Sequence, residues 1–286
     1  MLVRGAAPVV VGVNGTSAGL AAVRLAAREA VARGLELRVV HAFTWPNPRR
    51  GGNDQDYAPA RHAAAHFVEE AVTTATRSTP GVRVSGSLID GVPIRVLLQQ
   101  SRTAELLAVG DDDVAMVSSL PMDSVLLQIV SRARCPVVVA RGIRPPAGPL
   151  LAAVDGSAAS LLALRHAAAE ARRRQLAVEV AHVVEDPGHD AEETGRRLLE
   201  ASLAAVPQLT GARVTMLVGD PARALVRASR HARMMIVGPR GQDGATLLGP
   251  VAHQLLLKCA CPTVFVHGST AAERSHPGLL PEPAVP

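Results

Sequence analysis

Residues 8–43 read PVVVGVNGTSAGLAAVRLAAREAVARGLELRVVHAF, and residues 149–184 read PLLAAVDGSAASLLALRHAAAEARRRQLAVEVAHVV. The second stretch repeats the first at a constant offset of 141 residues, which pairs Val13 with Val154, Asn14 with Asp155, Gly15 with Gly156 and His41 with His182. Further along, slightly shorter offsets pair Gly110 with Gly238 and Cys135 with Cys261. A repeat of this length is too long for a solenoid unit, so the chain contains two copies of one domain.

Each copy alternates short β-branched segments with longer Ala/Leu-rich segments of helical period. In the first copy this pattern predicts strands at 8–13, 36–42, 82–89, 105–109 and 136–140 and helices at 18–33, 60–78, 93–102 and 123–133. In the second copy it predicts strands at 149–154, 177–184, 212–218, 233–237 and 262–266. Continuously apolar strands such as Val9–Val13 are typical of strands covered on both faces. The alternation therefore predicts an open parallel α/β sheet with right-handed crossovers in each copy.

We predict domains at residues 1–143 and 149–268, separated by a short linker that contains Pro and Gly. A disordered tail is expected at 269–286, because four prolines occur in its last ten residues. The segment Thr44–Pro59 is expected to be a long loop, either a flexible insertion or a lid over a site. It contains the chain's single Trp and single Tyr, Trp45 and Tyr57.

Composition excludes several classes of partner. The net charge of +5 would suit nucleic acid, but only Arg172–Arg174 cluster, and we interpret that triplet as the solvated end of a helix. Aromatic residues make up 2% of the chain, too few for a base-stacking surface, so no nucleic-acid partner is predicted. No signal peptide and no run of 18 apolar residues occurs, so no membrane partner is predicted either.

Three cysteines, Cys135, Cys259 and Cys261, cannot all pair, which indicates a reducing cytoplasm. The Cys259-Ala260-Cys261 segment has the form of half a metal site. No second cluster of Cys or His at ligand spacing accompanies it, so we predict no metal site.

The turns after the first and fourth strands lie at the carboxyl ends of the strands, where open α/β sheets bind their ligands. In the second copy these turns contain Asp155 and the segment Gly238–Gly241, and Gly249 precedes the next helix. Glycines ahead of a helix offer backbone N–H groups to a phosphate, and Arg240 would add a charge-assisted contact. Asp155 would accept hydrogen bonds from a ribose or a base edge. Taken alone, this pattern also fits glycines that only make turns.

The combination of motifs is more specific. A strand ending in V-D-G-S, a G-x-P turn after strand three, a V-G-x-R-G loop after strand four and a C-P before strand five resemble the universal stress protein family. The resemblance covers both copies. It implies two Rossmann-like domains with strand order 3-2-1-4-5, a cytoplasmic setting and a tendency to dimerise, so we expect a pseudo-dimer of the two copies and a homodimer of the chain. In the family, ATP binders carry an acidic residue after strand one and a G-x2-G-x9-G-[S/T] phosphate loop.

The first copy departs from this pattern. Asn14 replaces the acidic residue, Asp111-Asp112-Asp113 follow Gly110, and Asp123 replaces the later glycine and leaves only Ser124. Each uncompensated carboxylate about 4 Å from a phosphate costs on the order of 1–4 kcal/mol. We therefore predict that the first domain binds no ATP, and we interpret the Asp triplet as a solvated acidic turn in preference to a cation site.

The second copy keeps more of the pattern, although seven residues instead of nine separate its last two glycines and Pro250 replaces Ser/Thr. By the resemblance, Val183 and Val237 match positions that line adenine. The predicted nucleotide site comprises Ala153, Asp155, Val183, Val237, Gly238, Arg240, Gly241, Gly249 and Val251. Its ligand would be ATP, AMP or a related adenine nucleotide, bound in the second domain only, with Mg²⁺ entering only with the nucleotide.

No catalytic set of residues accompanies this site. His41 and His182 occupy equivalent strand positions and suggest a shared structural role, Ser157 suits a helix N-cap, and the sole lysine, Lys258, lies far from both loops. Our first hypothesis is a cytoplasmic stress-response protein, not an enzyme, that senses an adenine nucleotide through its second domain. The alternative is a nucleotide-free scaffold that pairs through exposed fifth strands, Val137–Ala140 and Thr263–Val266. A weak ATPase is the third hypothesis.

Overall fold

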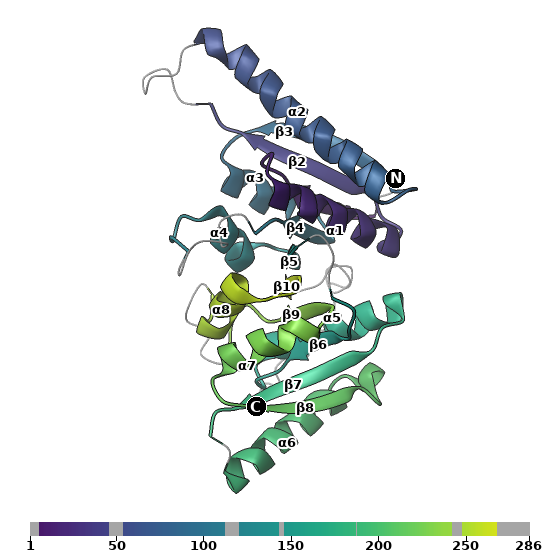
Figure 1. Ribbon diagram of the computed structural model, residues 1–286, viewed down its shortest axis with the longest axis vertical. Coiled ribbons are helices and arrows are strands. Elements are labelled where there is room, and N and C mark those ends of the chain that lie inside the picture. Colours follow the sequence, from purple (N-terminus) through teal and green to yellow (C-terminus); the bar gives the residue numbers. More distant parts are fainter. Residues whose placement is uncertain are drawn as a thin grey trace, which may run out of the picture.

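The computed structural model describes residues 6–45, 54–111, 120–142, 146–186, 188–241 and 248–267. Its strands form one sheet in the order β3-β2-β1-β4-β5-β10-β9-β6-β7-β8, which runs along the long axis of the molecule (Figure 1). The strands are β1 (Val9–Gly12), β2 (Leu37–Phe43), β3 (Val84–Asp90), β4 (Leu106–Val109), β5 (Val137–Val139), β6 (Leu150–Ala153), β7 (Val178–Val184), β8 (Arg213–Val218), β9 (Met234–Val237) and β10 (Thr263–Phe265).

Each domain has the strand order 3-2-1-4-5, with all of its strands parallel, as the sequence predicted. The helices are α1 (Ser17–Arg33), α2 (Asp54–Ser78), α3 (Pro93–Gln100), α4 (Val125–Arg132), α5 (Ala158–Arg174), α6 (His189–Ala204), α7 (Pro221–Ala228) and α8 (Pro250–Lys258), with short 3-10 turns at Pro207–Leu209 and Ser229–His231. Among the described residues, no helix has the length and apolar character needed to span a membrane.

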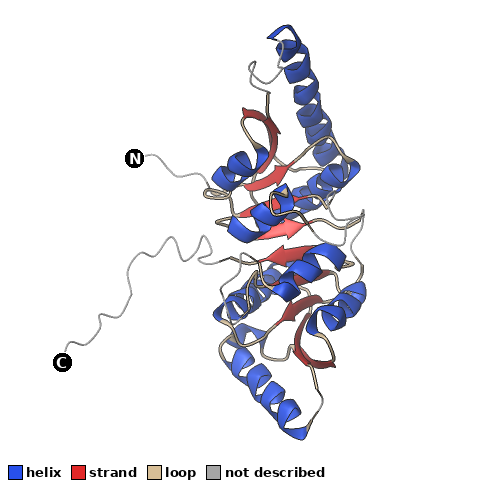
Figure 2. Ribbon diagram, turned by 90° about the vertical axis from the view of Figure 1, so that its left-hand side faces the viewer, coloured by secondary structure: helices blue, strands red, loops and turns tan. Residues whose placement is uncertain are grey.

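Helices cover both faces of the sheet (Figure 2). Because successive strand residues point to opposite faces, Val9 and Val11 join a core with α1, α2, α5 and α6, whereas Val10 joins a core with α3, α4, α7 and α8. Each of these two cores contains residues of both domains. The hydrophobic layers therefore continue across the domain boundary.

The predicted loop at Thr44–Pro59 is wrong in its second part, because α2 begins at Asp54 and runs through Pro59. Proline lacks the N–H group that would donate to the carbonyl four residues earlier, so Pro59 removes one hydrogen bond from the second turn of this helix. Trp45 and Tyr57 pack against Phe43, with ring centroids 5.6–6.2 Å apart. These two aromatic residues thus belong to a small cluster at the end of β2. Residues 46–53, the centre of the predicted loop, lie outside the described residues.

The two domains meet where β5 pairs antiparallel with β10. Val138 lies opposite Val264, its own equivalent in the repeat, so a pseudo-twofold axis passes through this pair. The prediction that the fifth strands present free edges is therefore wrong, because each satisfies the other's backbone groups within one chain. The tandem chain forms a pseudo-dimer through this junction.

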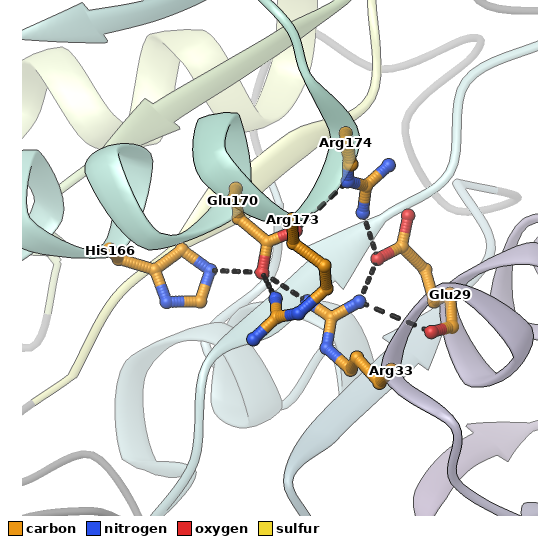
Figure 3. Close-up of polar contacts among 6 residues, drawn as sticks. All are labelled: Glu29, Arg33, His166, Glu170, Arg173 and Arg174. Carbon is orange, nitrogen blue, oxygen red and sulfur yellow. Dashed lines mark hydrogen bonds and ion pairs between the residues drawn. The ribbon is translucent and has the colours of Figure 1, made fainter.

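A second symmetric contact joins α1 to α5 (Figure 3). Arg33 contacts Glu29 of its own helix and Glu170 across the interface at 2.5 Å, while Arg174 contacts Glu170 of its own helix at 2.9 Å and Glu29 across it. Both carboxylates are almost fully buried. An offset of 141 residues relates Glu29 to Glu170 and Arg33 to Arg174, so the pairing is reciprocal, as twofold symmetry requires.

One prediction changes as a result. The Arg172–Arg174 triplet is not simply a solvated helix end, because Arg173 and Arg174 both form ion pairs with Glu170. Burial opposes ionisation of Glu170, but the nearby guanidinium of Arg33 and its neighbours hold the pKa of this carboxyl below its usual value. His166 lies 3.7 Å from Glu170, and its pKa falls to about 4 because burial penalises the imidazolium.

A third reciprocal contact involves the second residue after each fifth strand. Arg141 donates to the carbonyl of Leu256 in α8, and His267 donates to the carbonyl of Val130 in α4. Arg141 also pairs with Asp111 at 2.9 Å. The first carboxylate of the acidic triplet is therefore compensated, contrary to the prediction that all three repel a phosphate. Asp112 and Asp113 lie outside the described residues.

Candidate functional site

A cavity of about 490 Å³ opens at the carboxyl ends of β6, β7 and β9, between α7 and α8. The structure brings all nine predicted site residues to its walls: Ala153, Asp155, Val183, Val237, Gly238, Arg240, Gly241, Gly249 and Val251. They meet because parallel strands end at the same edge of the sheet. The role of these residues in binding a nucleotide stays a prediction.

Most of the cavity wall is apolar. Besides the predicted valines, Leu225 of α7 and Leu255 of α8 line it, and Ala181 and Ala252 leave space between them. Sequence reasoning missed these four residues. Comparing the two copies position by position offers a signal, because Val40 and Leu126 occupy the positions equivalent to the two alanines.

Asp155 lies at the polar side of the cavity, two residues after the end of β6. Its Oδ1 accepts a hydrogen bond from the backbone N–H of Ser157 at 2.9 Å. Ser157 in turn is the N-cap of α5 and accepts from the N–H of Ser160. The carboxylate is thus held by the turn that starts α5, with Oδ2 on the side of Gly241. Asn14 accepts from the N–H of Thr16 in the equivalent turn of the first domain.

Gly238 has a packing role that the sequence did not reveal. A Cβ at this position would lie 2.8 Å from the Cβ and 2.9 Å from the carbonyl carbon of Ala159 in α5. Gly110 in the first domain lies equally close to the backbone of Ala18. Glycine is therefore required at both positions for the fourth strand's turn to pass over the first helix, whatever the domain binds.

The phosphate-loop donors differ from the expectation. The N–H of Gly249 donates to the carbonyl of Pro239 at 2.9 Å, so it closes the loop. Because Pro250 begins α8, the N–H groups of Val251 and Ala252 have no partner within the helix. These two groups and the exposed guanidinium of Arg240 are possible anion donors in the described part of the loop. Residues 242–247 lie outside the described residues.

The paired histidines share one structural role. The Nδ1–H of His182 donates to the carbonyl of Val154 at 2.9 Å, and that of His41 donates to the carbonyl of Val13 at 2.7 Å. Each imidazole therefore ties the end of the second strand to the end of the first in its domain. This use of Nδ1 confirms the interpretation that the shared position reflects structure.

Comparison with known proteins identifies the family. The profile of the universal stress protein family matches residues 6–141 and again residues 147–267. The chain belongs to the universal stress protein family. A universal stress protein of Mycolicibacterium smegmatis is 29% identical over 283 residues, which cover 90% of this chain and 96% of that protein. A universal stress protein of Mycobacterium tuberculosis is 28% identical, with 91% of this chain and 96% of that protein covered.

A solved structure shares the whole architecture. The crystal structure of a universal stress protein from Archaeoglobus fulgidus aligns with a TM-score of 0.71 at 16% identity, covering 91% of this chain and 98% of that one. At this identity the likeness shows the fold. Tandem universal stress protein domains with a mostly parallel sheet are thus confirmed for this chain.

The first universal stress protein domain has a much smaller cavity, of about 180 Å³, at the equivalent place. Leu126 fills the space that Ala252 leaves in the second domain, and Val40 does the same at the position of Ala181. Leu97 also lines this cavity and packs closely on β1, since a Cβ at Gly12 would lie 3.0 Å from both terminal carbons of Leu97. Side-chain volume thus makes the first domain's cavity smaller, independently of any acidic turn.

The Cys259-Ala260-Cys261 segment lies away from this site. Both thiols are buried, and their sulfur atoms are 4.0 Å apart. Within the described ranges, no group of three or more His, Cys, Asp or Glu side chains is placed to hold a metal ion.

Proposed function

We propose that this universal stress protein is a non-catalytic sensor that binds an adenine nucleotide in its second domain and none in its first. The base would enter the apolar cavity between Val183, Val237 and Leu255, and the phosphates would lie near Arg240 and the start of α8. The observation that carries this proposal is the contrast between the two cavities, about 490 Å³ against about 180 Å³ at equivalent positions. Small-molecule sites usually measure about 300–1,000 Å³.

Charge supports the same assignment. At the mouth of its cavity the second domain presents the exposed cation Arg240 and the N–H groups of Val251 and Ala252, which have no partner within α8. A helix N-terminus and a guanidinium both favour phosphate. In the first domain Asp111 follows Gly110 in the equivalent turn and is paired with Arg141, and the sequence position equivalent to Arg240 is Asp112. An anion would therefore meet an exposed cation in the second domain and an already neutralised ion pair in the first.

Helix α8 connects the cavity of the second domain to the interface between the domains. Leu255 lines the cavity, and the carbonyl of the next residue, Leu256, accepts a hydrogen bond from Arg141 of the first domain. A nucleotide that shifts α8 would change this contact and so bias the arrangement of the two domains. We place this activity in the cytoplasm, without nucleic acid. A homodimer, if formed, would use a surface other than β5 and β10, since these strands already pair within the chain.

The absence of catalysis is part of the proposal. Ser157 is used as an N-cap and Nδ1 of His182 is held by the Val154 carbonyl, so neither is positioned as a nucleophile or base. Steady phosphate release from ATP above the level of an Ala252→Leu variant would overturn this part of the proposal.

Binding is tested by calorimetry with AMP and ATP. Wild-type protein is expected to bind one nucleotide per chain. Ala252→Leu, which gives the second domain the residue of the first, should lower affinity by at least about tenfold, because a leucine overfills the base pocket. Val40→Ala in the first domain is the matched control and should leave affinity unchanged. Absence of binding at millimolar nucleotide, or equal loss in both variants, would refute the proposal.

A further inference from the structure

A second cavity, of about 600 Å³, lies where the two domains meet beside the Pro239–Arg240 turn. The first domain contributes Arg132 and Arg134 from the end of α4, and the second contributes Arg240 and His267. All three arginines are exposed, and no carboxylate occurs among the described residues that line this groove. We call it the interdomain basic groove.

These arginines differ from the others at the interface. Arg33, Arg141 and Arg174 each form an ion pair with a buried or half-buried carboxylate. Arg132, Arg134 and Arg240, in contrast, form no ion pair with any described residue. Cations gathered in a groove without a counter-charge repel each other, and an anion in their midst would relieve that repulsion.

The pseudo-twofold axis shows that this groove is asymmetric. At the equivalent place on the other side of the axis, Asp111 occupies the position of Pro239, and Arg141 occupies the position of His267. Those two residues neutralise each other at 2.9 Å. In the repeat, Lys258 corresponds to Arg132, Ala260 to Arg134 and Asp112 to Arg240. The place equivalent to the groove therefore has one exposed lysine where the groove has three arginines, and this cluster of three lies beside the domain with the larger cavity.

Arg240 connects the two spaces, because it lines both the large cavity of the second domain and the interdomain basic groove. A ligand with its base in the cavity would therefore carry its phosphates past this guanidinium toward Arg132 and Arg134. We propose that the interdomain basic groove receives the terminal phosphates of the nucleotide, so that arginines of the first domain complete the site of the second. This inference rests on the proposed function and specifies its ligand as a nucleoside triphosphate or longer polyphosphate.

In this proposal the first domain contributes to ligand binding through its arginines, although its own cavity is too small for a nucleotide. Its arginines distinguish nucleotides by the length of the phosphate chain, since a monophosphate would end near Arg240. A triphosphate would instead connect the two domains directly. Occupancy would then depend on the phosphorylation state of the nucleotide as well as on its base.

The test compares AMP with ATP in calorimetry on the full chain. Arg132→Gln/Arg134→Gln should lower ATP affinity about tenfold, as expected for the loss of two screened charge contacts, and should leave AMP affinity within about twofold. The control is Arg172→Gln/Arg213→Gln, which removes two exposed arginines from a cavity at the opposite, amino-terminal edge of the second domain's strands. It changes net charge equally and should leave the preference for ATP unchanged.

The outcomes separate this inference from the proposed function. If wild-type protein binds AMP and ATP equally, or if the Arg132/Arg134 variant loses both alike, the groove does not receive phosphates and the inference is overturned, while the proposed base site stands. If neither nucleotide binds, the proposed function fails and the inference fails with it. If the control variant lost as much ATP affinity as the Arg132/Arg134 variant, the loss would be explained by the change in net charge alone, and the inference would be overturned.

Discussion

The buried ionic cluster between α1 and α5 should be the most sensitive polar contact at the domain interface. Arg33 contacts two carboxylates, Glu29 and Glu170, and about 4% of its side chain is exposed. Arg33→Met keeps the apolar stem but removes the charge from both. Removing one partner of a buried ion pair costs about 3–5 kcal/mol. Because Arg174 still contacts both carboxylates, we expect a value near the lower end, about 3 kcal/mol, in the free energy of unfolding.

Urea unfolding followed by circular dichroism measures this change. The matched control is Arg196→Met in α6, since Arg196 also contacts two carboxylates, Glu193 and Glu200, but is exposed. Its substitution should change stability far less, because solvent screens exposed pairs. In a double-mutant cycle, Arg33→Met and Glu170→Gln should be coupled by roughly 1–2 kcal/mol. Equal unfolding midpoints for Arg33→Met and Arg196→Met would refute the reasoning.

Three further predictions concern packing, protonation and the thiols. Gly238→Ala should destabilise the protein by about 2 kcal/mol in thermal unfolding, because the added Cβ would meet Ala159 at 2.8 Å, whereas Gly188→Ala, with nothing within 4 Å, should cost much less. His166 is held neutral, with a pKa of about 4 against 6.5 for the exposed side chain, so the unfolded chain binds the proton more readily. The free energy of unfolding should therefore be highest above pH 6.5 and should fall by about 3 kcal/mol as the pH drops from 6.5 to about 4. His166→Leu introduces the residue found at the equivalent position of the first domain, Leu25. The urea midpoint of this variant should depend less on pH between 6.5 and 4 than that of the wild-type protein. Cys135, Cys259 and Cys261 are buried, so a thiol reagent should label none of them quickly in the native protein and all of them in concentrated urea; rapid labelling of the native protein would contradict the structure.

Much of the fold was predictable because its signals are local. The apolar segment Val9–Val13 predicts a strand buried on both faces, and Ser157 predicts the start of α5, where it acts as the N-cap. The beginning of α2 was not predictable in the same way, since Pro59 normally marks a helix end. The domain boundaries at residues 143 and 149 and the tail at 269–286 stay predictions, because residues 143–145 and 268–286 lie outside the described residues.

The candidate site was predicted in part for a similar reason. Asp155, Val237 and Gly249 could be grouped in advance because parallel strands end at one edge of the sheet. The donor role of Gly249 could not be judged, since its N–H contacts Pro239 in a loop whose path the sequence does not specify. The alanines at 181 and 252 carry no motif, and their importance emerges only when the cavity that they leave is seen.

The sequence by itself determined that the chain contains the same α/β domain twice, because strand period, helix period and turn residues act over a few positions each. It also determined which residues would gather at the carboxyl edge of each sheet. Tertiary structure alone decided that Val138 pairs with Val264, that Glu29 and Arg174 meet across the interface, and which cavity stays open. These outcomes depend on the volume and charge of side chains far apart in the sequence, and only the packed chain brings those side chains into contact.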